Sequence, residues 1–174
     1  MKKTIIAAAF AATAALTMSN AFASAGTVNF TGEIIDAACT VDAGSVNQTV
    51  DLGRYSKSEF TAAGDKTAAT KFSIVLTNCP ATVTGATIKF DGSADPANSN
   101  LLAVTGGATG VAINLMTADS QDLPLAGVNN HVYSLAETVP NTLDFFAQYE
   151  ATSATVGVGP ANGVAKEGAN KFLI

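Results

Sequence analysis

Apolar and polar residues alternate with a period of two in several short segments of this chain. In segment 71–77, Phe72, Ile74 and Leu76 fall on one face, and segment 141–151 repeats the alternation. This period places successive side chains on opposite faces of a β-strand. Both segments are also rich in residues that favour strands, so the pattern predicts an all-β fold.

Further short segments of similar character are separated by turn-forming residues. Turns are predicted at 42–45, at Asp91-Gly92 and at Asn129-Asn130, and residues 53–69 are predicted to be a loop with a helical turn near 58–62. About seven or eight short strands with such turns predict an immunoglobulin-like sandwich. The other predicted strands are 28–34, 38–42, 49–52, 86–90, 101–104, 111–116 and 131–135.

The N-terminus has the pattern of a secretory signal peptide. Lys2 and Lys3 precede an apolar run over 5–18, and small residues then form a cleavage site. The run is shorter than the roughly 20 residues of a membrane-spanning helix. We expect cleavage after Ala23, with a second possible site after Ala25, and therefore an exported mature chain.

Charge excludes one class of partner. Taking Lys2 and Lys3 from the nine basic residues leaves seven, against 14 acidic ones, in the mature chain. An acidic protein is poorly suited to bind the phosphate backbone of nucleic acid. The remaining 151 residues are enough for one domain with a single core.

The chain has two cysteines, Cys39 and Cys79. In an exported protein their default state is a disulfide. Closing a loop of this length is worth about 4 kcal/mol in the chain-entropy model. Metal binding is the alternative, but one histidine and no C-x-x-C pair make a poor ligand set.

The sequence offers no constellation of catalytic residues. It contains no G-x-S-x-G motif, and His131, the single histidine, follows a predicted turn and is expected to be an exposed hairpin residue. Glycines 157, 159 and 163 do not have dinucleotide-binding spacing. We therefore expect no enzyme activity, no cofactor and no metal site.

Three segments together resemble the major pilins of chaperone-usher fimbriae of the type 1 kind. Residues 26–53 resemble the start of a mature pilin, 72–79 the strand with the second cysteine, and 146–152 a further strand of the family. The resemblance covers residues 26 to about 163. The first segment reads GTVNFTGEIIDAACTVDAGSVNQTVDLG, and the last reads FAQYEAT.

The resemblance implies an incomplete immunoglobulin-like sandwich whose core is open along a groove. A periplasmic chaperone fills the groove first, and the N-terminal strand of the next subunit replaces it at the outer-membrane usher. This donor-strand exchange is a form of β-strand addition. The implied function is that of a major subunit polymerising into a surface fimbria used in adhesion, without nucleic-acid partners or a membrane span.

The expected donor strand carries Val28, Phe30, Gly32 and Ile34 on one face, with Gly32 where the family places its donor glycine. The alternation alone fits equally well an internal first strand of a complete sandwich. With the resemblance, the expected plan is a signal peptide at 1–23, a donor extension at 24–36 and a pilin domain at 37–174.

The C-terminus departs from the family pattern of an alternating strand with a penultimate aromatic residue. Leu173 is penultimate, and Lys166, Glu167 and Gly168 interrupt the alternation, which predicts a weakened strand. Two interpretations stay open: either the end is altered relative to a functional pilin, or Phe172 and Ile174 replace the usual residues in a shifted register and are then expected to contact the chaperone. Whether the chain is a major or a minor adaptor subunit stays open, as does a role as a secreted ligand-binding adhesin module.

Overall fold

A computed structural model describes residues 29–31, 39–125, 127 and 129–173. The chain divides into two units, residues 1–34 and 35–174, and each is described by itself. The described part of the first unit, 29–31, forms no strand. The second unit contains these elements: β1 (Thr40–Val41), the 3₁₀ turn η1 (Lys57–Glu59), β2 (Thr70–Thr77), β3 (Val83–Gly92), β4 (Leu102–Ala103), β5 (Val111–Thr117), β6 (Tyr133–Ser134), β7 (Asn141–Ala151) and β8 (Ala165–Leu173).

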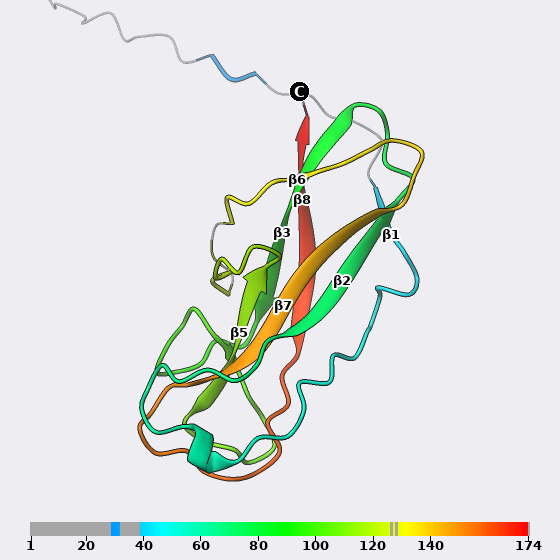
Figure 1. The fold of residues 1–174 in the computed structure, drawn as a ribbon. Coiled ribbons are helices and arrows are strands. Elements are labelled where there is room, and N and C mark those ends of the chain that lie inside the picture. The colour runs from blue at the N-terminus through cyan, green and yellow to red at the C-terminus, as the bar shows by residue number, and fades with distance from the viewer. Residues whose placement is uncertain (1–28, 32–38, 126, 128, 174) are drawn as a thin grey trace, which may run out of the picture. The chain divides into compact units, whose positions relative to one another are not determined.

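The strands form two antiparallel sheets. One has the order β1-β2-β7-β5-β4, and the other has the order β6-β3-β8 (Figure 1). Long strands lie at the centre of the first sheet, where β7 pairs with β2 on one side and β5 on the other. The predicted all-β fold is confirmed.

The inward faces of the strands form one hydrophobic core. Ile74 and Leu76 of β2 and Leu143 and Phe145 of β7 are at most 2% exposed, as their alternation predicts. The ring of Phe145 lies at the centre, stacked on Phe72 with ring centroids 5.5 Å apart. Burial of these side chains is the main source of the fold's stability.

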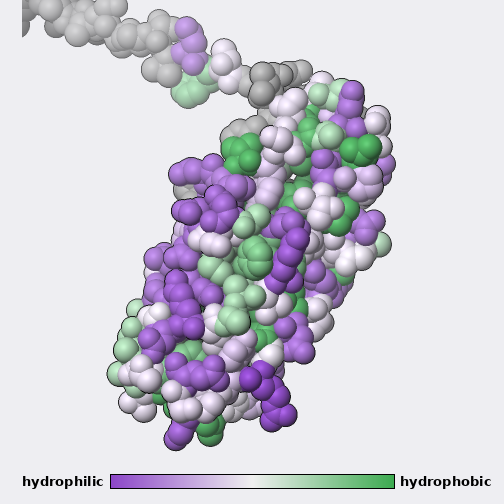
Figure 2. Space-filling model, viewed as in Figure 1, coloured by the Kyte–Doolittle hydropathy of each residue, from purple (hydrophilic) through white to green (hydrophobic). Residues whose placement is uncertain are grey.

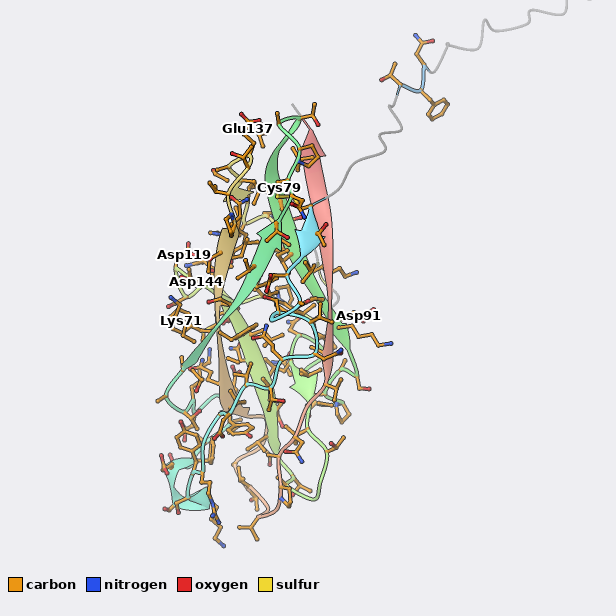
Figure 3. The ribbon with its side chains drawn as sticks, turned by 90° about the vertical axis from the view of Figure 1, so that its right-hand side faces the viewer. Lys71, Cys79, Asp91, Asp119, Glu137 and Asp144 are labelled. Carbon is orange, nitrogen blue, oxygen red and sulfur yellow. A yellow bond between two sulfur atoms is a disulfide. The ribbon has the colours of Figure 1, made fainter. Side chains whose placement is uncertain are left out.

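The outer face of the first sheet carries paired polar side chains. Lys71 Nζ lies 2.7 Å from the Asp144 carboxylate, which also accepts a hydrogen bond of 2.7 Å from the Ser73 hydroxyl. Figure 3 shows Lys71 and Asp144 on the same side of the molecule. The hydrogen bonds from Lys71 and Ser73 lower the pKa of Asp144 below its ordinary value of 3.8. Ionised Asp144 therefore stabilises the fold.

Replacing Asp144 by asparagine is expected to lower the free energy of unfolding by about 0.5 kcal/mol at pH 7, because a largely exposed pair is screened by water. A lowered pKa gives stability that is present above the unfolded value of 3.8 and is lost as the pH falls through the folded value. Urea unfolding should therefore separate the variant from the parent at pH 7 but not at strongly acid pH. Glu137→Gln, on an exposed turn residue, is the control and should be neutral at pH 7.

The surface has mixed polarity. On the face drawn in Figure 2, hydrophobic residues form short patches between hydrophilic ones. This is the ordinary appearance of the outer side of a sandwich. No helix within the described residues has the length and apolar character needed to cross a membrane.

Two sequence predictions about strands are wrong. The predicted strand 49–52 is absent, since residues 48–56 belong to no strand. There, Asp51 accepts a hydrogen bond of 2.9 Å from the Gly53 amide, and Gly53 has a φ of 84°, so a local turn takes the place of a ladder. The predicted turn at Asp91-Gly92 is part of β3, because these two residues pair with Lys166 and Ala165.

The predicted weakening of the C-terminal strand is also wrong for its backbone. β8 pairs with β3 from Ala165 opposite Gly92 to Leu173 opposite Val83. Gly168 lies within the ladder, opposite Lys89. A continuous partner strand thus outweighs the local preferences of Lys166, Glu167 and Gly168.

The predicted disulfide is present. Cys39 and Cys79 are bonded, just before β1 and just after β2. β1 pairs with the end of β2, with Thr40 opposite Thr77. The bond therefore ties the start of the domain to its first long strand.

Candidate functional site: an open groove between the sheets

A groove of about 1280 Å³ opens between the two sheets. The first sheet lines it with apolar side chains from β2, β4, β5 and β7, and the second sheet lines it from β3 and β8. Two irregular segments, 47–57 and 156–164, contribute further lining. The core-facing lining residues are Phe72, Phe90, Leu102, Val111, Ile113, Leu115, Ala147 and Tyr149.

The groove exposes part of the hydrophobic core. Phe72 and Tyr149 are only half-buried although they pack against core residues. Phe72 and Phe90 pack edge to face with ring centroids 5.9 Å apart. An apolar opening of this size is costly in water, since each square ångström of apolar surface that is later covered contributes about 25 cal/mol.

The walls of the groove have main-chain groups without sheet partners. Among the described strands, β8 pairs with β3 alone and is the edge of its sheet. Residues 48–56, which share the groove's lining with β8, belong to no strand. Figure 3 draws the segment after β1 descending near β8. A sheet edge beside an apolar groove is the arrangement that accepts an added β-strand.

Tyr149 contacts both irregular segments that line the groove. Its hydroxyl donates a hydrogen bond of 2.8 Å to the Ala161 carbonyl, and its ring packs edge to face with Tyr55 at 6.1 Å. Partial burial, with a smaller effect of Asp51 and Tyr55, raises the pKa of Tyr149. The tyrosine therefore stays neutral and joins segment 47–57 to segment 156–164.

Four charged side chains also line the groove: Asp51, Arg54, Lys57 and Glu167. Glu167 lies opposite the core residue Phe90 in the β3–β8 ladder. Burial raises the pKa of Glu167 above its ordinary value of 4.5. A carboxylate thus lies in the lining of the groove, beside the apolar side chains that face the core.

The predicted donor residues fall mostly outside the described part of the chain. Val28, Gly32 and Ile34 lie outside it, as does the predicted signal peptide. Phe30 is described and its side chain is 93% exposed. Of the two C-terminal residues predicted to contact a chaperone, Phe172 lies in β8 opposite Gly85, and Ile174 lies outside the described residues.

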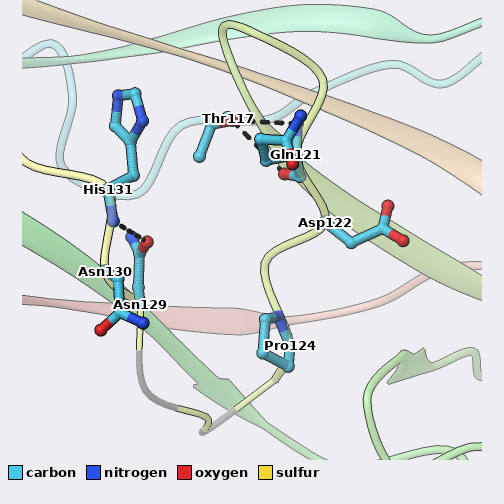
Figure 4. A pocket seen from close by; sticks show the side chains of 7 residues that line it. All are labelled: Thr117, Gln121, Asp122, Pro124, Asn129, Asn130 and His131. Atoms are coloured by element: carbon cyan, nitrogen blue, oxygen red, sulfur yellow. Dashed lines mark hydrogen bonds between the residues drawn. The ribbon is translucent and has the colours of Figure 1, made fainter.

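A smaller cavity of about 330 Å³ lies at the 117–131 connection (Figure 4). It is lined by His131, which is half-buried and not the exposed residue that the sequence predicts. The His131 ring packs on Tyr133 with centroids 4.5 Å apart, and its Nδ1 lies 3.6 Å from the Asp119 carboxylate. These contacts give the histidine a structural role. In the described part of the chain, no three His, Cys, Asp or Glu side chains gather as a metal site.

Sequence reasoning missed the groove-lining role of segment 156–164 and the inward position of Glu167. Segment 156–164 contains Gly157, Gly159 and Gly163, which indicated a flexible connection. The backbone instead passes close to residues 105–109, with Thr109 and Gly157 exchanging hydrogen bonds of 3.3 and 2.9 Å. Glycine has no Cβ and therefore permits such a close approach of two backbones, which is what these glycines could have indicated in the sequence.

Comparison with known proteins places the chain among fimbrial subunits. The family model described as "Fimbrial protein" matches residues 28–166. The type-1 fimbrial protein A chain of Salmonella typhi is 42% identical over 145 residues, which cover 80% of this chain and 78% of that protein. A probable major fimbrial subunit of Escherichia coli O157:H7 is 40% identical over 171 residues, covering 93% of this chain and 92% of the relative.

Solved structures agree with the sequence relatives. The P pilus rod subunit PapA superposes with a TM-score of 0.68 and 26% identity, covering 78% of this chain and 100% of that one. The match identifies the sandwich as the incomplete immunoglobulin-like fold of pilus subunits. The expected fold class is therefore confirmed, and the chain belongs to the fimbrial protein family.

Proposed function

We propose that this fimbrial protein is the major structural subunit of a surface fibre used in adhesion, and that subunits join by donor-strand exchange. In this proposal residues 1–23 are removed on export, residues 24–36 form the donor strand, and residues 37–174 form the acceptor domain. Fimbrial proteins form a family of structural subunits and not of enzymes. The observation that carries the proposal is the open apolar groove beside the unpaired edge of β8.

A β-strand inserted in this groove would make two kinds of contact, one through its main chain and one through its side chains. Its main chain would hydrogen-bond the free edge of β8, and its alternate side chains would cover Phe72, Phe90 and Tyr149. The extension supplies an apolar face at Val28, Phe30 and Ile34, with Gly32 between them. Phe30, which is 93% exposed, is the largest of these side chains and gains most from burial.

The same groove accounts for the proposed export partners. An apolar opening beside a free sheet edge aggregates unless it is covered. A periplasmic chaperone would cover it by the same strand addition until the outer-membrane usher exchanges it for the next subunit. Chaperone contact through Phe172 and Ile174 is part of this proposal. Relatives described as a type-1 fimbrial A chain and as a probable major subunit favour the shaft role over a minor adaptor.

The test is the variant Phe30→Asp in the mature chain, compared with Asn29→Asp. A charge on the buried face of the donor strand must be desolvated, whereas one on the opposite face stays in water. We expect electron microscopy to show fibres for Asn29→Asp and for the parent, and only monomers or very short oligomers for Phe30→Asp.

Mixing the Phe30→Asp variant with the parent protein gives a second test of the proposal. Phe30→Asp keeps its own groove, so it can accept a strand but not donate one, and adding it to the parent should shorten fibres in proportion to its share. Equal polymerisation by Phe30→Asp would contradict the proposal. Unfolding of the Phe30→Asp monomer, seen by circular dichroism, would place the strand inside its own domain instead.

A further inference from the structure

We propose that the groove takes up a proton at Glu167 when the donor strand of a second copy fills it, so that subunit joining tightens as the pH falls. The inference rests on the proposed function and concerns the regulation of the same site.

Glu167 stands where an inserted strand must pass. It lies in β8, whose free edge is the one available for pairing, and it lines the groove itself. Its cross-strand neighbour in β3 is Phe90, which is 6% exposed and packs on Phe145 with ring centroids 5.3 Å apart. In the open groove Glu167 is still exposed to water. Filling the groove along β8 would remove that water.

The side chains of the donor strand do not neutralise the carboxylate. Residues 24–36 contain no lysine, arginine or histidine, and their charged side chains, Glu33 and Asp36, are acidic. The one cation of the segment is the α-amino group that cleavage leaves on Ser24, four residues before the first apolar donor residue, Val28. The expected inserted face is apolar. Covering a carboxylate with such a strand disfavours its charged form, because burial raises the pKa of an acid. The burial that already raises the pKa of Glu167 in the open groove has the same sign.

The cations near the groove do not hold Glu167 in the open state. Arg54 and Lys57 come from the segment on the other wall, with Asp51, Tyr55 and Tyr149 beside them. On the two paired strands the neighbouring charges are Lys89 and Asp91 of β3 and Lys166 and Lys171 of β8. Of these, the cations whose side chains the structure describes, Arg54, Lys57, Lys89 and Lys166, form no ion pair with Glu167 within 4.0 Å.

Covering Glu167 in this way makes its pKa higher in the joined state than in the open one, so the joined state binds more protons. The contribution of protonated Glu167 to subunit joining is fully present at pH values below the pKa that Glu167 has in the open groove. It is lost as the pH rises through the pKa that Glu167 has in the joined state. Between these limits the joining equilibrium changes by up to about tenfold per pH unit.

The test compares fibres of the parent with fibres of Glu167→Gln, which carries the neutral isostere of the protonated side chain. The matched control is Asp91→Asn, an exposed carboxylate of β3 whose replacement keeps the acceptor for the Gly92 amide. Fibres are titrated with guanidinium chloride at pH 7.5 and at pH 4.5, and sedimentation measures the concentration at which half of the subunits are released.

We expect Glu167→Gln fibres to resist more denaturant than parent fibres at pH 7.5, and the two to agree at pH 4.5. Asp91→Asn should follow the parent at both. Equal midpoints for the parent and Glu167→Gln at pH 7.5 would overturn the proposal, because Glu167 would then not be covered. A lower midpoint for Glu167→Gln would also overturn it, and would mean that Arg54 or Lys57 pairs with the carboxylate. Failure of the parent to form fibres would instead refute the proposed function.

Discussion

Replacing both cysteines, Cys39→Ala with Cys79→Ala, is expected to lower the free energy of unfolding by about 4 kcal/mol. The bond closes a loop with a sequence separation of 40 and anchors β1, which otherwise rests on two paired positions with β2. Without the bond, the unfolded chain gains the freedom of the open loop. Urea unfolding of the monomeric mature chain measures the loss.

Reduction of the parent protein is the matched control for the double variant. Dithiothreitol removes the same bond without changing any side chain's size, so both treatments should give a similar midpoint. If reduction leaves the free energy of unfolding of the parent protein unchanged, the prediction is wrong and the disulfide does not stabilise the domain.

Replacing Phe145 by alanine is expected to cost about 3–5 kcal/mol of folding stability. The side chain is 0% exposed and its ring lies within 5.5 Å of the rings of Phe72, Phe90 and Tyr133, measured between centroids. Its removal leaves a cavity where both sheets meet. The same urea titration, followed by circular dichroism, measures the change.

Phe146→Ala is the control for this variant. Phe146 is the next residue of β7, points to the opposite face and is half-buried. It loses the same atoms from a less buried position, and we expect a cost of about 1 kcal/mol. Equal costs for the two variants would contradict the assignment of Phe145 to the centre of the core.

Local alternation was enough to predict the long central strands but not the edges. β2 and β7 bury one face deeply, so their sequences carry a clear period of two, whereas β5 is buried at every position and shows no such alternation. β8 was predicted to be a weakened strand because Lys166, Glu167 and Gly168 obscure that period, and its partner β3 is some 80 positions earlier in the chain. Pairing between such distant segments leaves little trace in either sequence.

The groove shows the same limit for the candidate site. The sequence pattern does not distinguish its aromatic lining from a closed core, because a residue beside an open groove and one inside a closed core have the same apolar character. Only the resemblance to pilins indicated that the sandwich was open. The turn at Asp51 and Gly53, which stops segment 48–56 from forming a strand, depends on one side-chain hydrogen bond and one positive φ.

The position of β8 as the last described strand affects the order in which the parts of the subunit can form. The proposed donor residues come first in the chain, whereas β8, which lines the groove, follows every other described strand. Pairs between segments so far apart in the sequence form slowly in folding. We therefore expect the β3–β8 ladder, and with it the groove, to be completed late in folding, whereas the proposed donor segment needs no other strand of its own chain.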